Sequence, residues 1–416
     1  MSWELGCWKQ PPTSGKKRGG YEGASLVCPH CQRDARFVER RGKWCESLLG
    51  SLRIERCYYH CRGCGRGHVP WDQALGLGVA TLTPAASEVA SIAGVQTSFA
   101  QSAEVTLQKL CGLRLSESTV ERVTEGAGAR LAKLLEDKMT FGERKPWAWQ
   151  RDARGKTCAY VGLDATGVRQ QADRGAKADG RMAYVGMLYN PRSKHDERAV
   201  TPHCVRYLAG FYELDELGLQ LRRQAAQVGW DEAEQQIALS DGGNGLEEFF
   251  RRNFPRAECI LDFWHAAEHL TELGLALYPD DESQRQERVG GWCHQLKHEG
   301  GATMLATLEQ LELSEATRHP AKPAAGCPAS ARAAHADCVR YFQNHHHRMD
   351  YPRYVANGWQ IGSGPVESAC KTVVANRLKG SGMRWGEDGS NAVCHLRALY
   401  LSQTGQWESF WKNYPN

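Results

Sequence analysis

The stretch IGSGPVESACKTVVANRLKGSGMRW, residues 361–385, guides the interpretation of the whole fold. Pro is favoured at the first position of a helix, and Ser or Gly suits the capping position before it, so a helix is expected to begin near Pro365. Glu367 then lies in the first turn, close to the positive end of the helix dipole. Lys371 follows four residues later on the same face. A carboxylate at a glycine-rich junction with basic residues behind it suits metal-assisted phosphate chemistry, although a simple Glu367–Lys371 ion pair is the plainer alternative.

Two aspartates far upstream extend this interpretation. Asp164 ends the apolar run Thr157–Leu163, and Asp241 ends the run Gln236–Ser240. Both runs have the length and residue types of buried strands. Strands that alternate with helices indicate an α/β core with carboxylates at strand ends. The further elements expected in this core are strands at Met182–Tyr189, His203–Ala209 and Glu258–Leu261, and helices at Leu246–Phe254 and from Asp262 to about Tyr278.

The carboxylates of Asp164, Asp241 and Glu367 stand 77 and 126 residues apart along the chain. Sites that hold two divalent ions about 3.5–4 Å apart need acidic ligands of this kind. Mg²⁺ is a hard ion that takes few protein carboxylates and leaves positions for water and phosphate. The pattern therefore predicts a site for two Mg²⁺ (or Mn²⁺) ions formed by these three residues.

Near the N-terminus, 29 residues separate two Cys-x-x-Cys pairs, Cys28 with Cys31 and Cys61 with Cys64. Two such pairs can present four thiolates tetrahedrally to one zinc ion. The intervening residues are expected to form a hairpin with strands at Arg40–Ser47 and Ser51–Tyr59. The segment is therefore predicted to be a zinc ribbon with an extended hairpin. The ligand set stays open to substitution by Cys57, His30, His60 or His68.

The next part of the chain, Thr83 to Met139, has a helical pattern. Thr83 is a cap before a helix-start proline, a second helix is expected over Ser98–Cys111, and Ser116 caps a third helix after the break at Gly112. A helix, a glycine turn and a capped helix form a helix-turn-helix candidate, with a plain helical hairpin as the alternative. The residues expected to face DNA are Glu117, Ser118, Thr119 and Arg122.

Composition places the 416-residue chain among globular proteins of two or three domains, with 41% hydrophobic and 24% charged residues. Residues 1–70 hold 13 Lys/Arg and 6 Asp/Glu, a net +7, and because the whole chain carries +4 the rest sums to −3. A basic segment indicates an anionic partner such as nucleic acid, or otherwise a solvated basic face. Sixteen cysteines without a secretion signal argue against a disulfide framework, and no run of eighteen apolar residues predicts a membrane span. We therefore expect a cytoplasmic protein.

Several stretches resemble bacterial insertion-sequence DDE transposases of the ISKra family. They are VGLDATGV, ALSDGGNGL, ILDFWHAAEHL and residues 361–385, and the resemblance runs from about Cys28 to the end of the chain. It implies an RNase H-like catalytic core interrupted by a helical insertion, with Asp164, Asp241 and Glu367 as the catalytic triad. We assign auxiliary or DNA-contacting roles to Asp262, His265, Lys371, Arg377, Lys379 and Arg122. For His265, simple packing or capping together with His269 is the alternative.

The expected architecture is multidomain α/β. Its segments are a disordered leader (1–24), the zinc ribbon (25–72), a helical DNA-binding domain (80–140), the first part of the RNase H-like core (157–275), the helical insertion (276–355), and the last part of the core with the Glu367 helix (356–416).

The expected function is DNA transposition. The protein would bind terminal inverted repeats as a homo-oligomer and catalyse Mg²⁺-dependent cleavage and strand transfer into target DNA, in the bacterial cytoplasm near the nucleoid. The first alternative is a domesticated, non-catalytic DNA-binding regulator, which the intact triad disfavours. The second alternative is another RNase H-fold nuclease.

Overall fold

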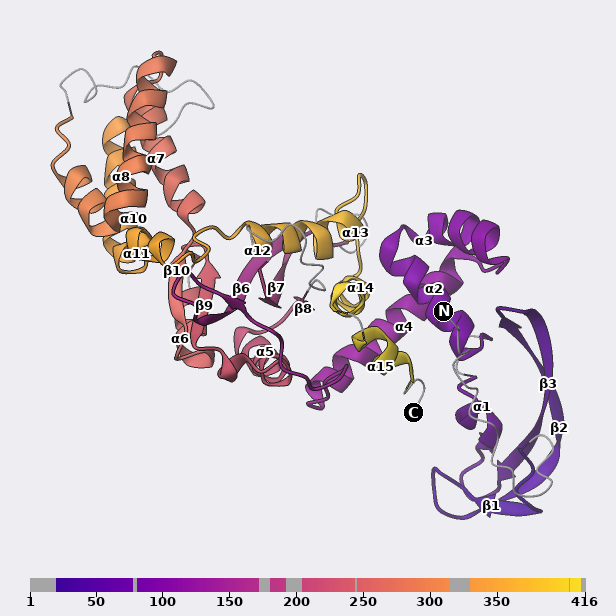
Figure 1. Cartoon of the computed structure of the whole chain (residues 1–416). Coiled ribbons are helices and arrows are strands. Elements are labelled where there is room, and N and C mark those ends of the chain that lie inside the picture. Colours follow the sequence, from indigo (N-terminus) through magenta and orange to yellow (C-terminus); the bar gives the residue numbers. More distant parts are fainter. Residues whose placement is uncertain are drawn as a thin grey trace. The chain divides into compact units, whose positions relative to one another are not determined.

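The structure is a computed structural model of a mixed α/β chain (Figure 1). It describes residues 20–77, 81–171, 180–191, 204–243, 245–313, 330–403 and 405–412. The chain divides into two compact units, residues 1–124 with 410–416, and residues 125–409. The division falls within helix α4 (Glu117–Glu136), and each unit is described by itself below.

The first unit contains an antiparallel sheet with the strand order β1-β2-β3-β4. Its main feature is the hairpin of β2 (Asp34–Ser47) and β3 (Gly50–Cys61), which the short strands β1 (Ser25–Val27) and β4 (Gly67–His68) flank. The predicted hairpin is confirmed and is longer than expected. Gly50 makes the tight turn with φ of +107°, a conformation that favours glycine.

Residues just before the sheet pack against it. The ring of Tyr21 meets Phe37 edge-on at 5.3 Å between centroids, and the Tyr59 hydroxyl accepts a hydrogen bond from Glu22 N at 2.8 Å. Residues 20–24, which were expected to belong to a disordered leader, are therefore part of the ribbon. Residues 1–19 of that leader lie outside the described residues.

Helices follow the sheet in the order that the sequence predicts. Thr83 caps α2 by accepting a hydrogen bond from Ala86 N, and Gly112 ends the second helical segment with φ of +67°. Ser116 accepts a hydrogen bond from Thr119 N at the start of α4. The remaining bounds are α1 (Pro70–Ala74), α2 (Pro84–Gln96), α3 (Phe99–Gln101) and the wider π-type turns of η2 (Ser102–Leu110).

The second unit is built on a mixed sheet with the order β10-β9-β6-β7-β8, and β5 pairs with β6 outside this path. Strands β6, β7 and β8 are antiparallel, whereas β9 and β10 run parallel to β6. The bounds are β5 (Gln150–Arg151), β6 (Thr157–Val168), β7 (Arg181–Tyr189), β8 (Val205–Gly210), β9 (Gln235–Ser240) and β10 (Glu258–Leu261).

Helices cover both faces of this sheet, as two glycines indicate. A Cβ built on Gly162 of β6 would lie 2.2 Å from Val366 Cγ2, so α12 (Gly364–Ala369) packs directly on that face. A Cβ on Gly186 of β7 would instead meet Leu221 of α5 at 3.4 Å. Gly186 pairs with Leu163, the neighbour of Gly162, and successive residues of a strand point to opposite faces. Helix α5 (Leu214–Gln227) therefore covers the face opposite α12.

The stretch expected to be helical, residues 276–355, contains α8, α10 and α11, and these helices pack in one group with α7, which was expected to belong to the core. Its buried side chains include Trp292, Leu296, Met304 and Phe342. The loop expected near residues 319–328 lies outside the described residues. The bounds are α7 (Phe263–Leu277), α8 (Glu282–Glu309), α10 (Ala331–His345), η5 (His346–Arg348) and α11 (Tyr351–Ala356).

The remaining elements are η4 (Trp230–Glu232), α6 (Leu246–Asn253), η6 (Cys370–Ala375), α13 (Asn376–Leu378), α14 (Glu387–Leu401) and α15 (Gln406–Lys412). Elsewhere in this unit the structure differs from expectation. Helix α5 was not foreseen, and strand β6 does not end at Asp164. It runs on to Val168 because β7 continues to pair with it as far as Arg181.

The close packing of α12 on β6 leads to a prediction about the stability of the protein. We expect Gly162→Ala to destabilise the protein by about 1–3 kcal/mol, because the added methyl group overlaps Val366 and forces the helix away from the sheet. Gly167→Ala in the same strand is the matched control, since its Cβ would lie 3.7 Å from the nearest atom, Met182 Sδ. Denaturant unfolding of both variants measures the difference, and equal stability would contradict this packing.

Candidate functional sites

Asp241 and Asp262 directly follow the carboxyl ends of β9 and β10, and Asp164 lies level with Asp241 within β6. Gly162 of β6 pairs with Leu239 of β9, so Asp164, two residues on, is level with Asp241. Leu261 of β10 pairs with Ser240, and Asp262 N donates a hydrogen bond to the Ser240 carbonyl at 2.9 Å, which brings Asp262 beside Asp241. Asp164 shares the face of Gly162, because alternate residues of a strand point the same way, and this is the face that α12 covers.

Asp164, Asp241 and Asp262 together are called the acidic edge of the sheet. Glu367 is connected to this acidic edge through one hydroxyl group. Ser363 Oγ lies 2.5 Å from Asp262 Oδ2 and 3.0 Å from Glu367 Oε1. A single hydroxyl hydrogen can serve one acceptor at a time, so Ser363 joins two carboxylates without neutralising either. Asp262 is buried, and its other oxygen caps α7 by accepting a hydrogen bond from Trp264 N at 2.9 Å.

Burial raises the pKa of the Asp164 carboxyl above its usual range, and the charge of Asp241 adds to this effect. The backbone N–H of Ala165, 2.6 Å from Asp164 Oδ1, and the thiol of Cys370 oppose the rise in pKa. Among the described residues, no lysine, arginine or histidine nitrogen lies within 4.0 Å of a carboxylate oxygen of Asp164, Asp241, Asp262 or Glu367. The edge therefore concentrates negative charge, and none of the described basic side chains forms an ion pair with it.

The auxiliary residues predicted near this edge differ in their contacts and in their exposure to solvent. The His265 charge acts on the pKa of Asp164, although its Nδ1 also lies 3.3 Å from Glu268 Oε2. Lys379 Nζ donates a hydrogen bond to Thr166 Oγ1, two residues after Asp164 on β6. Lys371 is exposed. Within the first unit, Arg122 is exposed on α4, as expected.

Two expectations for this region need correction. Arg377 is 2% exposed, and its guanidinium lies over the Trp385 ring at 4.9 Å, so in this structure it packs inside the protein and does not face solvent. The plain Glu367–Lys371 ion pair is not formed within 4.0 Å in the described part of the chain. The backbone widens to a π-type turn from Cys370 onward, which disturbs the four-residue spacing that such a pair needs.

His269 was the alternative partner of His265, and the structure gives it a packing role. Its ring lies 3.8 Å from the ring of Tyr341, and burial lowers its pKa. Sequence reasoning missed Tyr341, Ser363 and Cys370 as neighbours of the acidic edge. Ser363 stands in the quoted Gly-Ser-Gly run, where it was interpreted only as a helix cap.

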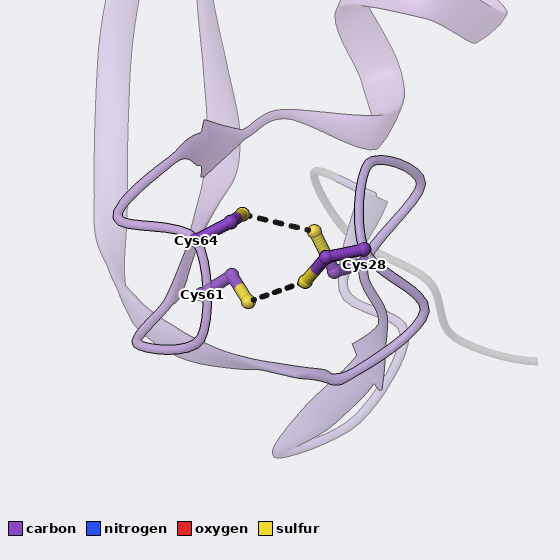
Figure 2. Close-up of side chains that lie close together, drawn as sticks. Cys28, Cys61 and Cys64 are labelled. Atoms are coloured by element: carbon purple, nitrogen blue, oxygen red, sulfur yellow. Dashed lines mark hydrogen bonds between the residues drawn. The ribbon is translucent and has the colours of Figure 1, made fainter.

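The four cysteines of the predicted zinc site lie together in the first unit. Their sulfur atoms all lie within 4.8 Å of one another, with Cys28 and Cys64 at 3.7 Å and Cys31 and Cys61 at 3.5 Å. Figure 2 shows the labelled side chains pointing toward a common centre. Zinc–sulfur bonds of about 2.3 Å in a tetrahedron require sulfur atoms about 3.8 Å apart, so the four thiols fit a structural metal ion such as zinc.

The alternative ligands do not join this cluster. Among the described residues, the four cysteines are the only set of three or more cysteine, histidine or acidic side chains whose ligand atoms lie so close together. Cys57 lies in the small buried core of the ribbon, which also contains Ala35, Tyr59 and the cluster members Cys28 and Cys61. His30 Nδ1 lies 3.2 Å from a guanidinium nitrogen of Arg66. By the same distance criterion, the carboxylate oxygens of the acidic edge do not lie close enough together to form such a set.

The backbone favours ionisation of one thiol in particular. The N–H of His30 lowers the pKa of Cys28 to about 7. The pKa of Cys31 is raised to about 11, because the N–H of Arg33 does not offset burial and the neighbouring thiols. Four thiolates at this spacing need a cation among them, and metal binding would supply it.

Comparison with protein-family models found no match for this chain, and comparison with curated proteins found none either. In the described part of the chain, every helix is too short or too polar to cross a membrane.

The cysteine geometry predicts about one equivalent of zinc in the purified protein. The buried core around the site is small, so removing the metal with a chelator should unfold the ribbon. Cys28→Ser and Cys61→Ser should lose the zinc, whereas Cys111→Ser, which changes an exposed cysteine outside the cluster, should keep it. Metal analysis beside circular dichroism measures both effects. A folded wild-type sample with less than about half an equivalent of zinc would contradict the site.

Proposed function

We propose that this chain is a DDE-type transposase of an insertion sequence, which binds terminal inverted repeats and catalyses Mg²⁺-dependent DNA cleavage and strand transfer. The observation that carries the proposal is the level arrangement of Asp164 and Asp241 beneath α12, the helix that bears Glu367. These are the three carboxylates that the family resemblance assigns to catalysis, and they come from distant parts of the chain.

The topology of the second unit supports an RNase H-like core. Three antiparallel strands, β6 to β8, stand beside the parallel strands β9 and β10, with helices on both faces. The helices α8, α10 and α11 come between β10 and α12 in the sequence, where the resemblance implies an insertion.

The donor set fits hard divalent cations. The edge offers carboxylate oxygens, which Mg²⁺ prefers, and the described residues place no side-chain cation among them. A pair of ions about 3.5–4 Å apart does not require the three carboxylates to meet at one point, which agrees with their spread along the edge. When bound, two such ions would activate an attacking water or 3′-hydroxyl and stabilise the leaving oxygen.

Neighbouring residues would hold in place the acidic side chains that bind these ions. Ser363 orients Glu367 and Asp262 through its hydroxyl, and the thiol of Cys370 contacts Asp164. Asp262 also fixes the start of α7, on which His265 lies. Holding acidic ligands in place before the substrate arrives lowers the reorganisation needed during phosphoryl transfer.

The first unit is suited to bind DNA. Residues 1–70 carry a net charge of +7, and the hairpin exposes Arg36, Arg40, Arg41 and Arg53 to solvent. Exposed arginines can neutralise phosphates and release counterions. Arg122 on α4 adds a further exposed cation in the helix-turn-helix candidate. We propose that this unit binds the inverted repeats, and that a homo-oligomer holds two element ends together.

The central test is Glu367→Gln. The substitution keeps the shape of the side chain and its contact with Ser363 but removes the charge, so we expect cleavage and joining to fall by about 100-fold or more while repeat binding stays nearly intact. The assay is gel-based cleavage of a labelled repeat-ended duplex with Mg²⁺ or Mn²⁺, run beside a gel-shift measurement of binding.

A matched control is Glu387→Gln, which removes an exposed carboxylate from the first turn of α14 and should leave cleavage unchanged. Cleavage by Glu367→Gln at the wild-type rate would remove Glu367 from the site. A wild-type protein that binds repeats but never cuts them would favour the non-catalytic regulator. Preference for RNA or branched DNA would favour another RNase H-fold nuclease.

A further inference from the structure

A groove of about 720 Å³ lies beside the acidic edge of the second unit. The segment that leads to Glu367 forms one of its walls, with Ile361, Gly362, Gly364 and Pro365 among its lining residues. Its volume lies within the range of about 300–1,000 Å³ typical of small-molecule sites. The proposed function does not use this groove.

An exposed tryptophan stands at the groove. Trp264, in the first turn of α7, is 66% exposed, although indole rings are usually largely buried because of their apolar area. Its backbone N–H binds Asp262, so its position is fixed relative to the acidic edge. A Cβ on Gly362 would lie 3.1 Å from Trp264 Cδ1, which means that the absence of a side chain at Gly362 lets the indole lie close against the loop.

The rest of the lining combines aromatic rings with cations. Tyr160 and Trp359 also line the groove but are buried, so Trp264 supplies the exposed ring, and Lys297 and Arg151 contribute positive charge. Asp152 also lines the groove, but its oxygens accept hydrogen bonds from the N–H groups of Arg154 and Lys156 and from the indole of Trp359. An exposed aromatic ring beside cations is what an unpaired nucleotide needs, since the base stacks on the ring and the cations neutralise the phosphate.

We propose that this groove binds an unpaired nucleotide of the DNA substrate, with its base stacked on Trp264, next to the phosphate that reacts at the acidic edge. The inference rests on the proposed function for the identity of the DNA. The link between the two sites is short, because Trp264 N binds Asp262 and Ser363 joins Asp262 to Glu367. Every base has a π face, so this contact would tolerate any sequence at that position.

The test uses the full-length protein and two fluorescent probes. The first probe is a single-stranded oligonucleotide that contains one 2-aminopurine. The second is a series of duplexes with the sequence of the DNA that flanks the gene, in which the 2-aminopurine occupies successive positions near the end. We expect the fluorescence of the bound single strand to change on stacking. Trp264→Ala should abolish this change and weaken single-strand binding by roughly fivefold to 100-fold. Trp264→Phe should restore most of both, because a phenyl ring also stacks.

Leu275→Ala is the control, since it removes an exposed apolar side chain from the other end of α7. Single-strand binding and fluorescence that are equal in wild type and Trp264→Ala would overturn the groove proposal. The proposed function fails separately, if the wild-type protein does not cut the duplex in the presence of Mg²⁺. In that case the single-strand measurement still decides the groove.

Discussion

The parallel pairing of β6 with β9 is the constraint on which the candidate catalytic site depends. Its register makes Asp164 level with Asp241, and the adjoining pairing of β10 adds Asp262 to the row. Gly162 then allows α12 to lie directly on β6, since any side chain there would collide with Val366. A shift of one residue in this register would turn Asp164 to the other face of the sheet, away from Glu367.

This arrangement makes the stability of the fold depend on pH. Burial and the charge of Asp241 raise the pKa of Asp164, so this carboxyl keeps its proton to a higher pH in the folded protein than in the unfolded chain. The contribution of Asp164 to stability is therefore greatest at a pH below the pKa of the unfolded chain and is lost as the pH rises through the folded pKa. At neutral pH the ionised Asp164 therefore lowers the stability of the fold. The cysteine cluster poses the same electrostatic problem within a small core, and one metal ion would resolve it.

The parts of the structure that depend on local sequence could be predicted. The two Cys-x-x-Cys pairs, the hairpin between them and the strands before Asp241 and Asp262 follow from spacing and apolar runs. Helix α5 was missed because Gln220 and Gln224 lie on its buried face and interrupt the apolar stripe; Gln224 is held there by Arg206 on β8, 18 residues earlier. The contact of Arg377 with Trp385 and the bridge from Ser363 to Asp262, 101 residues away, likewise depend on how the folded chain packs, which no periodic pattern encodes.

The most direct measurement is anomalous diffraction from crystals of the protein with Mn²⁺, with or without a repeat-ended duplex. Manganese takes the same oxygen ligands as magnesium and gives a signal at its own position. We expect two peaks about 3.5–4 Å apart, bounded by the carboxylates of Asp164, Asp241 and Glu367. Crystals with ordered duplex at this edge and Mn²⁺ bound elsewhere, but no anomalous density between these carboxylates, would contradict a metal-dependent catalytic site.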